Sequence, residues 1–418
     1  MTILDILKKG EVPSFFKEIS KEEDIPIEKI VEEVKSGRAV IAYNKIHKNL
    51  KPIVIGSLFK TKVNVNIGIS PLSSNFEEEK EKVKIALKLK TDTIMDLSVG
   101  KDASNFRKWL IKKSTVPVGT VPIYQIANKF PQIEEANFQN FLDEIEIQAK
   151  EGVDFMTIHS GFLKEHIPFI RKRKIGIVSR GGALIYCWMR KRREENPFYS
   201  HFDEILEILH QYDVTISIGD ALRPGSIVDS SDKAQFAELE TIGKLLKKCK
   251  ARGVQAMVEG PGHIPLNQIE MNVKKALKIC KGAPFYVLGP VVCDNAGGYD
   301  HITASIGATL AGFYGASLLC YVTPKEHLGL PNINDVREGL IAFKISAISA
   351  DIANGKKYAI EIQKEMANAR KNFLWEKQFS LMLDPERARE YFKEGVKEEG
   401  DFCSMCGPQF CPMKLTKT

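Results

Sequence analysis

FDEILEILHQYDVTISIGD at residues 202–220 and QFAELETIGKLLKKCKARGVQAMV at residues 235–258 decide the fold class. Each stretch begins with a helix-like pattern and ends in a short apolar or β-branched run, Val214–Gly219 in the first and Val254–Val258 in the second. Runs of this length and composition are typical of buried strands. Because helix and strand alternate, the two stretches predict a parallel sheet.

The same alternation extends over most of the chain. Further strand candidates are Val63–Ile69, Thr93–Leu97, Gly119–Tyr124, Phe155–His159, Ile175–Ser179, Phe285–Leu288 and Leu318–Val322. Helical stretches include Glu77–Leu89, Phe138–Glu151, Phe202–Tyr212 and Gln235–Lys250. Eight or nine such units over roughly 260 residues predict an α/β fold, a closed (β/α)8 barrel of the TIM type. Nine candidates are one too many, and periodicity alone does not say which lies outside the barrel.

Flanking segments extend the barrel at both ends. A helix pattern over Lys21–Gly37 and a short strand over Ala39–Tyr43 predict a small cap or dimerisation element. Behind the barrel, helices are expected at Ile333–Asn354 and Lys356–Gln378. The expected domains are an N-terminal module at 1–60, the catalytic barrel at 61–330, C-terminal helices at 331–392, and a tether with a cysteine tail at 393–418.

Composition narrows the function classes. The 418 residues include 60 Lys and Arg, 53 Asp and Glu, and 44% hydrophobic residues, which is ordinary for a globular protein with a large core. The net charge of +7 is small for this length and indicates neither a nucleic-acid nor a membrane partner. Because we find neither a signal-peptide pattern nor 18 consecutive apolar residues, we expect a cytoplasmic protein that acts on a small molecule.

Three of the eight cysteines stand together near the C-terminus, whereas the other five are scattered and are mostly expected to be buried. Cys403, Cys406 and Cys411 have the spacing Cys-x2-Cys-x4-Cys, with no fourth cysteine nearby and no histidine beyond His327. A structural zinc site needs four ligands, whereas three thiolates can hold a [4Fe–4S] cluster and leave one iron open. The pattern favours the cluster, with structural zinc and redox thiols as alternatives.

Polar side chains stand at or near the ends of successive strand candidates. In a TIM barrel such ends meet at one mouth, which is where active sites lie. The alternative is that strands simply end in polar residues. The residues concerned are Asn66, Met95-Asp96, Tyr124, His159, Ser179-Arg180, Asp220 and Glu259.

Two loops have the composition of phosphate sites. Ile177–Gly182 predicts a strand that ends in a Gly-Gly turn before a helix, and Gly219–Ser226 offers a second arginine and glycine turn. Backbone amides at such turns bind anions and an arginine adds a charged fork, although a tight loop with a solvated arginine would look similar. Glu259 and Asp294 are candidate acid–base groups. Candidate hydroxyl donors are Tyr124, Tyr286 and Tyr299.

Two histidines, His263 and His327, each follow a strand candidate. If both reach the barrel mouth, two imidazoles would leave open positions on a metal ion, which suits catalysis or ligand capture. Spacing alone does not establish the pair, since histidines 64 residues apart are usually unrelated.

Taken together, these motifs resemble the phosphomethylpyrimidine synthase family of radical S-adenosylmethionine enzymes. The resemblance extends in order from about residue 60 to the C-terminus. The stretches that carry it are NVNIGIS (64–70), DTIMDLS (92–98), VGTVPIYQ (118–125), DFMTIHSG (154–161), IVSRGG (177–182), LRPGSI (222–227), DKAQFAELETIG (232–243), MVEGPGH (257–263), APFYVLGP (283–290), GYDHITASIGA (298–308), LLCYVTPKEHLGLP (318–331) and FCSMCGPQFCPMK (402–414).

The resemblance implies a lyase that converts 5-aminoimidazole ribotide into 4-amino-5-hydroxymethyl-2-methylpyrimidine phosphate for thiamine biosynthesis, with loss of carbon monoxide and formate. It implies a [4Fe–4S] cluster on Cys403, Cys406 and Cys411, S-adenosylmethionine, an electron donor and a zinc-type metal on His263 and His327. It also implies a homodimer in which the tail reaches over the partner's active site. The implied substrate contacts are Asn66, Met95, Tyr124, His159, Ser179, Arg180, Gly181, Asp220, Ala221, Leu222, Arg223, Glu259 and Tyr286.

Departures from the family pattern define the alternatives. The long N-terminal domain of many members is missing, Ala221 replaces a common glycine, and residues 293–298 are CDNAGG where the family usually has TDIAPG. These changes beside the expected active site keep open a related product, the 5-hydroxybenzimidazole of anaerobic cobamide synthesis. More distant alternatives are a non-catalytic barrel that binds a phosphorylated ligand and a zinc hydrolase that uses His263 and His327.

Overall fold

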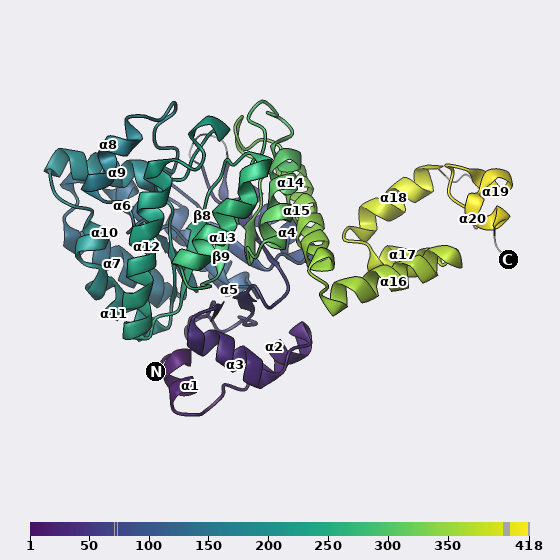
Figure 1. Ribbon diagram of the computed structural model, residues 1–418, viewed down its shortest axis with the longest axis horizontal. Coiled ribbons are helices and arrows are strands. Elements are labelled where there is room, and N and C mark those ends of the chain that lie inside the picture. Colours follow the sequence, from purple (N-terminus) through teal and green to yellow (C-terminus); the bar gives the residue numbers. More distant parts are fainter. Residues whose placement is uncertain (71, 73, 396–401, 417–418) are drawn as a thin grey trace. The chain divides into compact units, whose positions relative to one another are not determined.

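The computed structural model describes residues 1–70, 72, 74–395 and 402–416. The chain forms two compact units, Met1–Ala350 and Asp351–Thr418. The first unit is built around a barrel with helices outside it (Figure 1). The described part of the chain contains no helix long and apolar enough to cross a membrane.

Eight parallel strands close the barrel in the order β10-β3-β4-β5-β6-β7-β8-β9, which confirms the predicted (β/α)8 fold. The register pairs Asn66 with Met95 and Glu259 with Tyr286, so predicted site residues stand side by side on adjacent strands. The strands are β3 (Lys62–Ile67), β4 (Thr93–Asp96), β5 (Val118–Thr120), β6 (Phe155–Ile158), β7 (Thr215–Ile218), β8 (Ala256–Gly260), β9 (Phe285–Leu288) and β10 (Leu318–Cys320).

The helices around the barrel follow the predicted pattern, and two of them, α7 and α11, have the predicted bounds. In α7 the sequence fixes both ends: Asn137 forms a capping box with Asn140, and Gly152 ends the helix in the left-handed region at φ 101°. The helices are α4 (Phe76–Lys88), α5 (Ala103–Lys113), α6 (Pro122–Lys129), α7 (Phe138–Glu151), α8 (Ile167–Ile170), α9 (Arg180–Arg192), α10 (Pro197–Ser200), α11 (Phe202–Tyr212), α12 (Lys233–Arg252), α13 (Ile269–Ile279), α14 (Asp300–Phe313) and α15 (Ile333–Ala353), with 3-10 turns at Ile133–Glu135, Lys164–His166, Ile227–Asp229 and Leu266–Gln268.

The ninth strand candidate, Ile175–Ser179, was wrong and is the one that lies outside the barrel. Gly176 has φ +69° there, and Ile175 and Val178 are 48% and 41% exposed, so this run neither extends regularly nor belongs to the core. Ser179 instead caps α9, which places Gly181 and Gly182 inside the first helical turn rather than in a turn before it.

The strand expected over Gly119–Tyr124 was also too long. Strand β5 ends at Thr120, and Pro122 stands at the start of α6, where its missing N–H costs nothing. Tyr124 therefore comes from the first turn of a helix and not from a strand end.

The N-terminal segment has a hydrophobic cluster of its own, which includes Phe16, Ile30, Val34 and Phe59. The helix expected over Lys21–Gly37 is shorter, because Pro26 caps a new helix. The elements are α1 (Ile3–Lys8), α2 (Phe16–Glu23), α3 (Ile27–Ser36) and the antiparallel strands β1 (Ala39–Ile41) and β2 (Val54–Gly56).

The second unit is a set of helices stabilised by aromatic contacts. The ring of Trp375 lies 4.3 Å from that of Phe392, measured between centroids, and the ring of Phe379 lies 5.6 Å from it. The helix expected over Lys356–Gln378 is broken into two, because Phe373 adopts φ 53°. The helices are α16 (Lys357–Lys371), α17 (Trp375–Leu381), α18 (Pro385–Gly395), α19 (Gly407–Phe410) and α20 (Pro412–Leu415). Most of the predicted tether, at 396–401, lies outside the described residues.

Candidate active site

A pocket opens at the carboxyl ends of the barrel strands. Its lining brings together eight of the predicted contacts, from β3, β4, α6, β6, β8, β9 and the loop after β7. Ser179, Arg180, Gly181, Ala221 and Leu222 are not part of this lining. The full lining is Asn66, Met95, Leu97, Val121, Tyr124, Thr157, His159, Asp220, Arg223, Glu259, Gly260, Tyr286, Leu288 and Cys320.

The carboxylate of Glu259 is anchored from two neighbouring strands. Its Oε1 accepts hydrogen bonds from Thr157 Oγ1 at 2.6 Å and from Ser217 Oγ at 3.2 Å. Burial raises the pKa of Glu259, and these hydrogen bonds work against that rise. Both anchors use Oε1, so they fix the orientation of the carboxyl group in the pocket. Sequence reasoning missed Thr157 and Ser217, although both stand on strands beside predicted residues.

Asp220 and His159 each present a buried polar atom without a partner, Asp220 Oδ2 and His159 Nδ1. The other oxygen of Asp220 accepts from Arg223 at 3.1 Å, and His159 Nε2 lies 3.1 Å from Ser179 Oγ. Burial raises the pKa of Asp220 to about 8 and lowers that of His159 to about 3, so the imidazole is neutral near pH 7. Buried polar atoms are nearly always hydrogen-bonded, so this pair is suited to contact a polar ligand.

The amino end of α9 approaches the same region. Ser179 Oγ accepts from Gly182 N at 3.1 Å, and the guanidinium of Arg180 lies 4.9 Å from the ring centre of Tyr124. A Cβ on Gly181 would lie 2.3 Å from the ring of His159, so only glycine allows this close approach of helix and imidazole. A helix amino end with an adjacent arginine suits an anion, so the phosphate site stays a prediction, with a helix cap in place of the expected turn.

Two residues that sequence reasoning missed hold the loop Asp220–Arg223. Glu238 of α12, 1% exposed, accepts from the backbone N–H groups of Ala221 at 2.9 Å and Leu222 at 2.7 Å. Arg173 donates to the carbonyl oxygens of Leu222 at 2.5 Å and Arg223 at 3.3 Å. The backbone of the loop is therefore held from both sides, which fixes the positions of the Asp220 and Arg223 side chains.

Cys320, another residue that was not predicted, lies at the end of β10 against two predicted contacts. Its Sγ lies 3.2 Å from Tyr286 Oη and 3.1 Å from Asn66 Nδ2, and both groups donate to it. Burial raises the pKa of the Cys320 thiol to about 12, so it is a neutral thiol. Cys249 and Cys280 are also buried, whereas Cys187 and Cys293 are exposed.

His263 and His327 lie together, with ring centres 5.1 Å apart. Each Nδ1–H donates to a carboxylate oxygen at 2.9 Å, that of Asp294 for His263 and that of Asp300 for His327. Carboxylates orient metal-binding histidines in this way and leave Nε2 toward the metal. Asp294, which the sequence offered as an acid–base candidate, makes this contact, and its other oxygen accepts from Ser226 Oγ at 2.6 Å; the acid–base role stays a prediction.

Cys403, Cys406 and Cys411 line one pocket of the second unit together with aromatic and methionine side chains. All three are unpaired and partly exposed. Within the described parts of the chain, no three His, Cys, Asp or Glu side chains converge closely enough to hold a metal ion as they stand. The donor set nevertheless fits a cluster with three thiolate ligands and one open iron.

Three cysteine donors without a fourth, in a chain built on a TIM barrel, fit the class of iron–sulfur enzymes with an open coordination position. The chain belongs to the Radical SAM ThiC family, whose model it matches over residues 2–418. This family comprises radical S-adenosylmethionine lyases of the phosphomethylpyrimidine synthase type, which act in thiamine biosynthesis.

Among solved structures, the chain is similar to dihydropteroate synthases. That of Coxiella burnetii, in complex with pteroic acid, is 11% identical with a TM-score of 0.42, and the match covers 74% of this chain and 99% of that chain. That of Vibrio fischeri ES114 is 8% identical with a TM-score of 0.42, covering 73% and 96%. Similarity at this level says nothing about the function of the chain.

Proposed function

We propose that the chain converts 5-aminoimidazole ribotide into 4-amino-5-hydroxymethyl-2-methylpyrimidine phosphate, with release of carbon monoxide and formate. The observation that carries this proposal is the convergence of an anion site, two unpartnered buried polar atoms and an anchored carboxylate around one pocket. A phosphorylated ribose attached to a small polar ring offers a phosphate for the anion site, hydroxyls for the two unpartnered atoms and a ring for the carboxylate.

The phosphate binds at the amino end of α9. Backbone N–H groups of its first turn and the guanidinium of Arg180 supply donors, and Ser179 holds the turn in place through Gly182. Arg223 adds a second cation from the pocket wall. These charges account for the requirement that the substrate be a phosphate ester.

The ribose binds beside Asp220 and His159. Because Asp220 Oδ2 and His159 Nδ1 are buried and unpartnered, ribose hydroxyls would satisfy both. With a pKa raised to about 8, Asp220 is largely protonated near pH 7 and can donate as well as accept. The ring of the substrate then faces Glu259 and Tyr286, which hold and move protons at the carboxyl and phenol oxygens.

Cys403, Cys406 and Cys411 would hold the [4Fe–4S] cluster. When bound, the cluster would supply the electron for reductive cleavage of S-adenosylmethionine. His263 and His327 would hold a zinc-type metal through Nε2, since their Nδ1 atoms are engaged by Asp294 and Asp300. A homodimer, a low-potential electron donor and a cytoplasmic location belong to the same proposal.

The test is an anaerobic assay of the reconstituted protein with dithionite, S-adenosylmethionine and 5-aminoimidazole ribotide, followed by mass spectrometry. The proposal expects the pyrimidine phosphate together with 5′-deoxyadenosine. Cys403→Ala should abolish both products, whereas Cys187→Ala, outside the triad, should keep both. Formation of neither product by a protein with a reducible cluster would refute the proposal.

One local feature favours a second candidate product, 5-hydroxybenzimidazole. The loop 293–298 differs from the usual family pattern, and Cys293 Sγ donates to Asn295 Oδ1 at 2.7 Å there. Its Asp294 still orients His263, so the change leaves the metal pair intact. Detection of 5-hydroxybenzimidazole in the same assay would assign the chain to this branch.

A further inference from the structure

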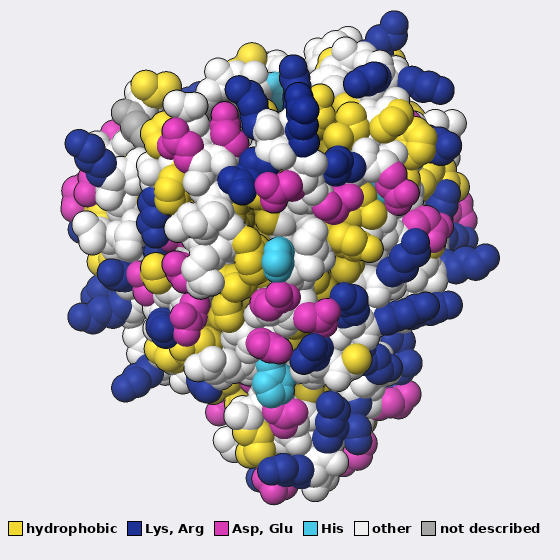
Figure 2. All heavy atoms as spheres, turned by 90° about the vertical axis from the view of Figure 1, so that its left-hand side faces the viewer, with side chains coloured by type: hydrophobic (Ala, Val, Ile, Leu, Met, Phe, Trp, Pro, Cys, Tyr) yellow, Lys and Arg dark blue, Asp and Glu magenta, His cyan; other side chains and the backbone are white. Residues whose placement is uncertain are grey.

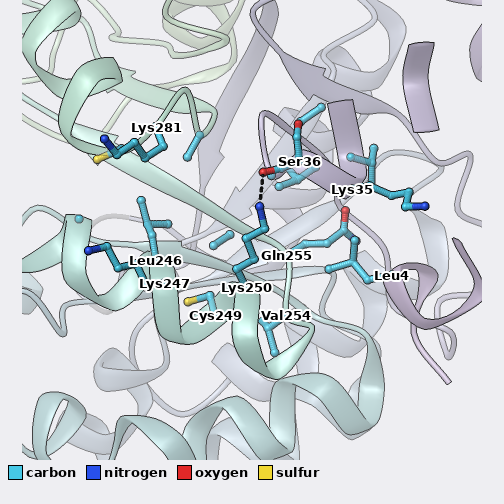
Figure 3. A pocket seen from close by; sticks show the side chains of 18 residues that line it. Leu4, Lys35, Ser36, Leu246, Lys247, Cys249, Lys250, Val254, Gln255 and Lys281 are labelled. Atoms are coloured by element: carbon cyan, nitrogen blue, oxygen red, sulfur yellow. Dashed lines mark hydrogen bonds between the residues drawn. The ribbon is translucent and has the colours of Figure 1, made fainter. Parts of the chain in front are cut away.

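A hollow lies at the amino ends of β8 and β9, at the opposite end of these strands from the predicted active site. It is formed by α3, α12 and the segments that lead into the two strands, and it encloses about 160 Å³ (Figure 3). A cavity of about this size accommodates a single aromatic ring. No residue of this hollow belongs to the pocket at the barrel mouth.

The floor of the hollow is apolar. Val40, Leu246, Cys249 and Val254 form part of it, and the buried Cys249 thiol has its pKa raised by burial, so it adds no charge. The side chain of Gln255 is engaged with the backbone of Ile41, at 2.8 Å to its N–H and 3.1 Å to its carbonyl oxygen. The floor therefore suits a flat apolar or aromatic group and offers little to a purely ionic ligand.

The rim of the hollow is basic. The lining includes four lysines; Lys247 and Lys281 lie on one side of the hollow, Lys250 in the middle and Lys35 on the other side (Figure 3). Lys250 donates to the carbonyl oxygen of Ser36 at 3.2 Å, whereas no described carboxylate forms an ion pair with the other three. Three ammonium groups on the rim are thus available to an anion.

A lysine-rich groove between α12 and α13 continues the rim. Lys247 and Lys281 line both the hollow and the groove, and Glu240 is the only carboxylate among the lining residues of the groove. Only Lys274 of this set has an ion pair, with Glu270 at 2.5 Å. The six lysines of the groove are Lys244, Lys247, Lys274, Lys275, Lys278 and Lys281.

Like charges gathered on one face repel each other, and a bound anion would offset this repulsion. By contrast, the left-hand face of the molecule mixes basic and acidic side chains (Figure 2). We infer that the hollow is a second ligand site, which binds a phosphorylated small molecule of the nucleotide class. Its phosphates contact Lys247 and Lys281, and its flat ring enters the apolar hollow.

Such a ligand would contact both the N-terminal module and α12. Lys35 stands at the end of α3, and Lys247 stands nine residues after Glu238, which holds the predicted substrate loop. Occupancy would therefore stabilise the junction between module and barrel and the helix that supports Asp220–Arg223. This site extends the proposed function but does not depend on it.

The test is isothermal titration of the full chain with ATP, pyrophosphate and adenosine, without magnesium. ATP should bind at least tenfold more tightly than either part alone, and its affinity should fall as salt rises. The double variant Lys247→Gln with Lys281→Gln should lose at least tenfold in affinity. Lys248→Gln is the matched control, because Lys248 lies on the same helix but pairs with Asp203 at 2.9 Å.

Three results would overturn the inference. They are an unchanged affinity in the double variant, loss of ATP binding on Arg223→Ala at the barrel mouth, and equal affinities for ATP and pyrophosphate. If the double variant does not fold, lysine acetylation of the unmodified chain gives the answer by mass spectrometry. ATP should then protect Lys247 and Lys281 and leave Lys248 reactive, and equal reactivity of all three would overturn the inference.

Discussion

Replacing Glu238 tests whether the loop Asp220–Arg223 depends on the two backbone hydrogen bonds that Glu238 accepts from it. Glu238 touches none of the groups that line the predicted active-site pocket, yet its two oxygens accept the N–H groups of Ala221 and Leu222. Both of these residues are fully buried, so Glu238→Ala leaves two donors without partners. An unsatisfied buried donor costs about 1–3 kcal/mol, which for two donors predicts a loss of roughly 2–6 kcal/mol in the free energy of unfolding.

Glu238→Gln tests whether Glu238 positions Arg223 for substrate binding or only stabilises the folded chain. A glutamine carries one acceptor oxygen, so it keeps one of the two hydrogen bonds and turns an NH2 group toward the other N–H. We expect a loss of about 1–3 kcal/mol in stability. In the assay, a displaced Arg223 should raise KM for the ribotide by at least fivefold, with a smaller change in kcat.

Urea denaturation and steady-state kinetics under anaerobic conditions measure both effects. Glu240→Gln is the control, since Glu240 is exposed two residues further along the same helix and should change neither quantity. The reasoning fails if Glu238→Ala unfolds at the same urea concentration as the unmodified chain. It also fails if Glu238→Gln loses stability and retains an unchanged KM, because Glu238 would then be structural only.

Arg180→Ala should raise KM for the phosphorylated substrate at least tenfold and should leave reductive cleavage of S-adenosylmethionine without substrate unchanged, as measured by 5′-deoxyadenosine. Cys320→Ser should preserve the fold by circular dichroism and lower kcat, because a hydroxyl is too short to reach both Tyr286 and Asn66. Asp213, with its pKa raised to about 7 by burial, contributes stability that is full below pH 4 and lost as the pH rises through 7. Asp213→Asn should therefore unfold at higher urea than the unmodified chain at pH 8 and at similar urea at pH 4.

The barrel could be predicted because each of its units repeats a local pattern. A buried parallel strand needs a short apolar run and a covering helix needs an apolar stripe, so the alternation is visible without any knowledge of the fold. Ile175–Ser179 has the composition of a buried strand but neither its extended conformation nor its burial. Its exposure and the positive φ of Gly176 depend on the loop that surrounds it, which no local pattern records.

The predicted pocket residues were those whose side chains face a ligand at the end of a strand, and topology alone brings such ends together. Two of the residues that were missed, Glu238 and Arg173, do not line the pocket but hold in place residues that do. Arg173 is 50 positions from Arg223, and Glu238 is 16 positions from Leu222 on another element, so both contacts depend on the tertiary packing around the loop. Asp300 likewise has no distinguishing context except the histidine that it contacts, and Asp294 was identified from the sequence only as a candidate acid–base group.

The loop at 293–298 differs from the usual family pattern but retains Asp294. The two carboxylate oxygens of Asp294 join His263 to Ser226 and Ile227, which follow Arg223 in the chain. The substitutions around Asp294 therefore change its neighbours but do not remove the contacts by which Asp294 joins His263 to the segment that follows Arg223. None of residues 293–298 lines the pocket at the barrel mouth, so we expect any effect of this loop on the product to act through the contacts of Asp294 with His263, Ser226 and Ile227.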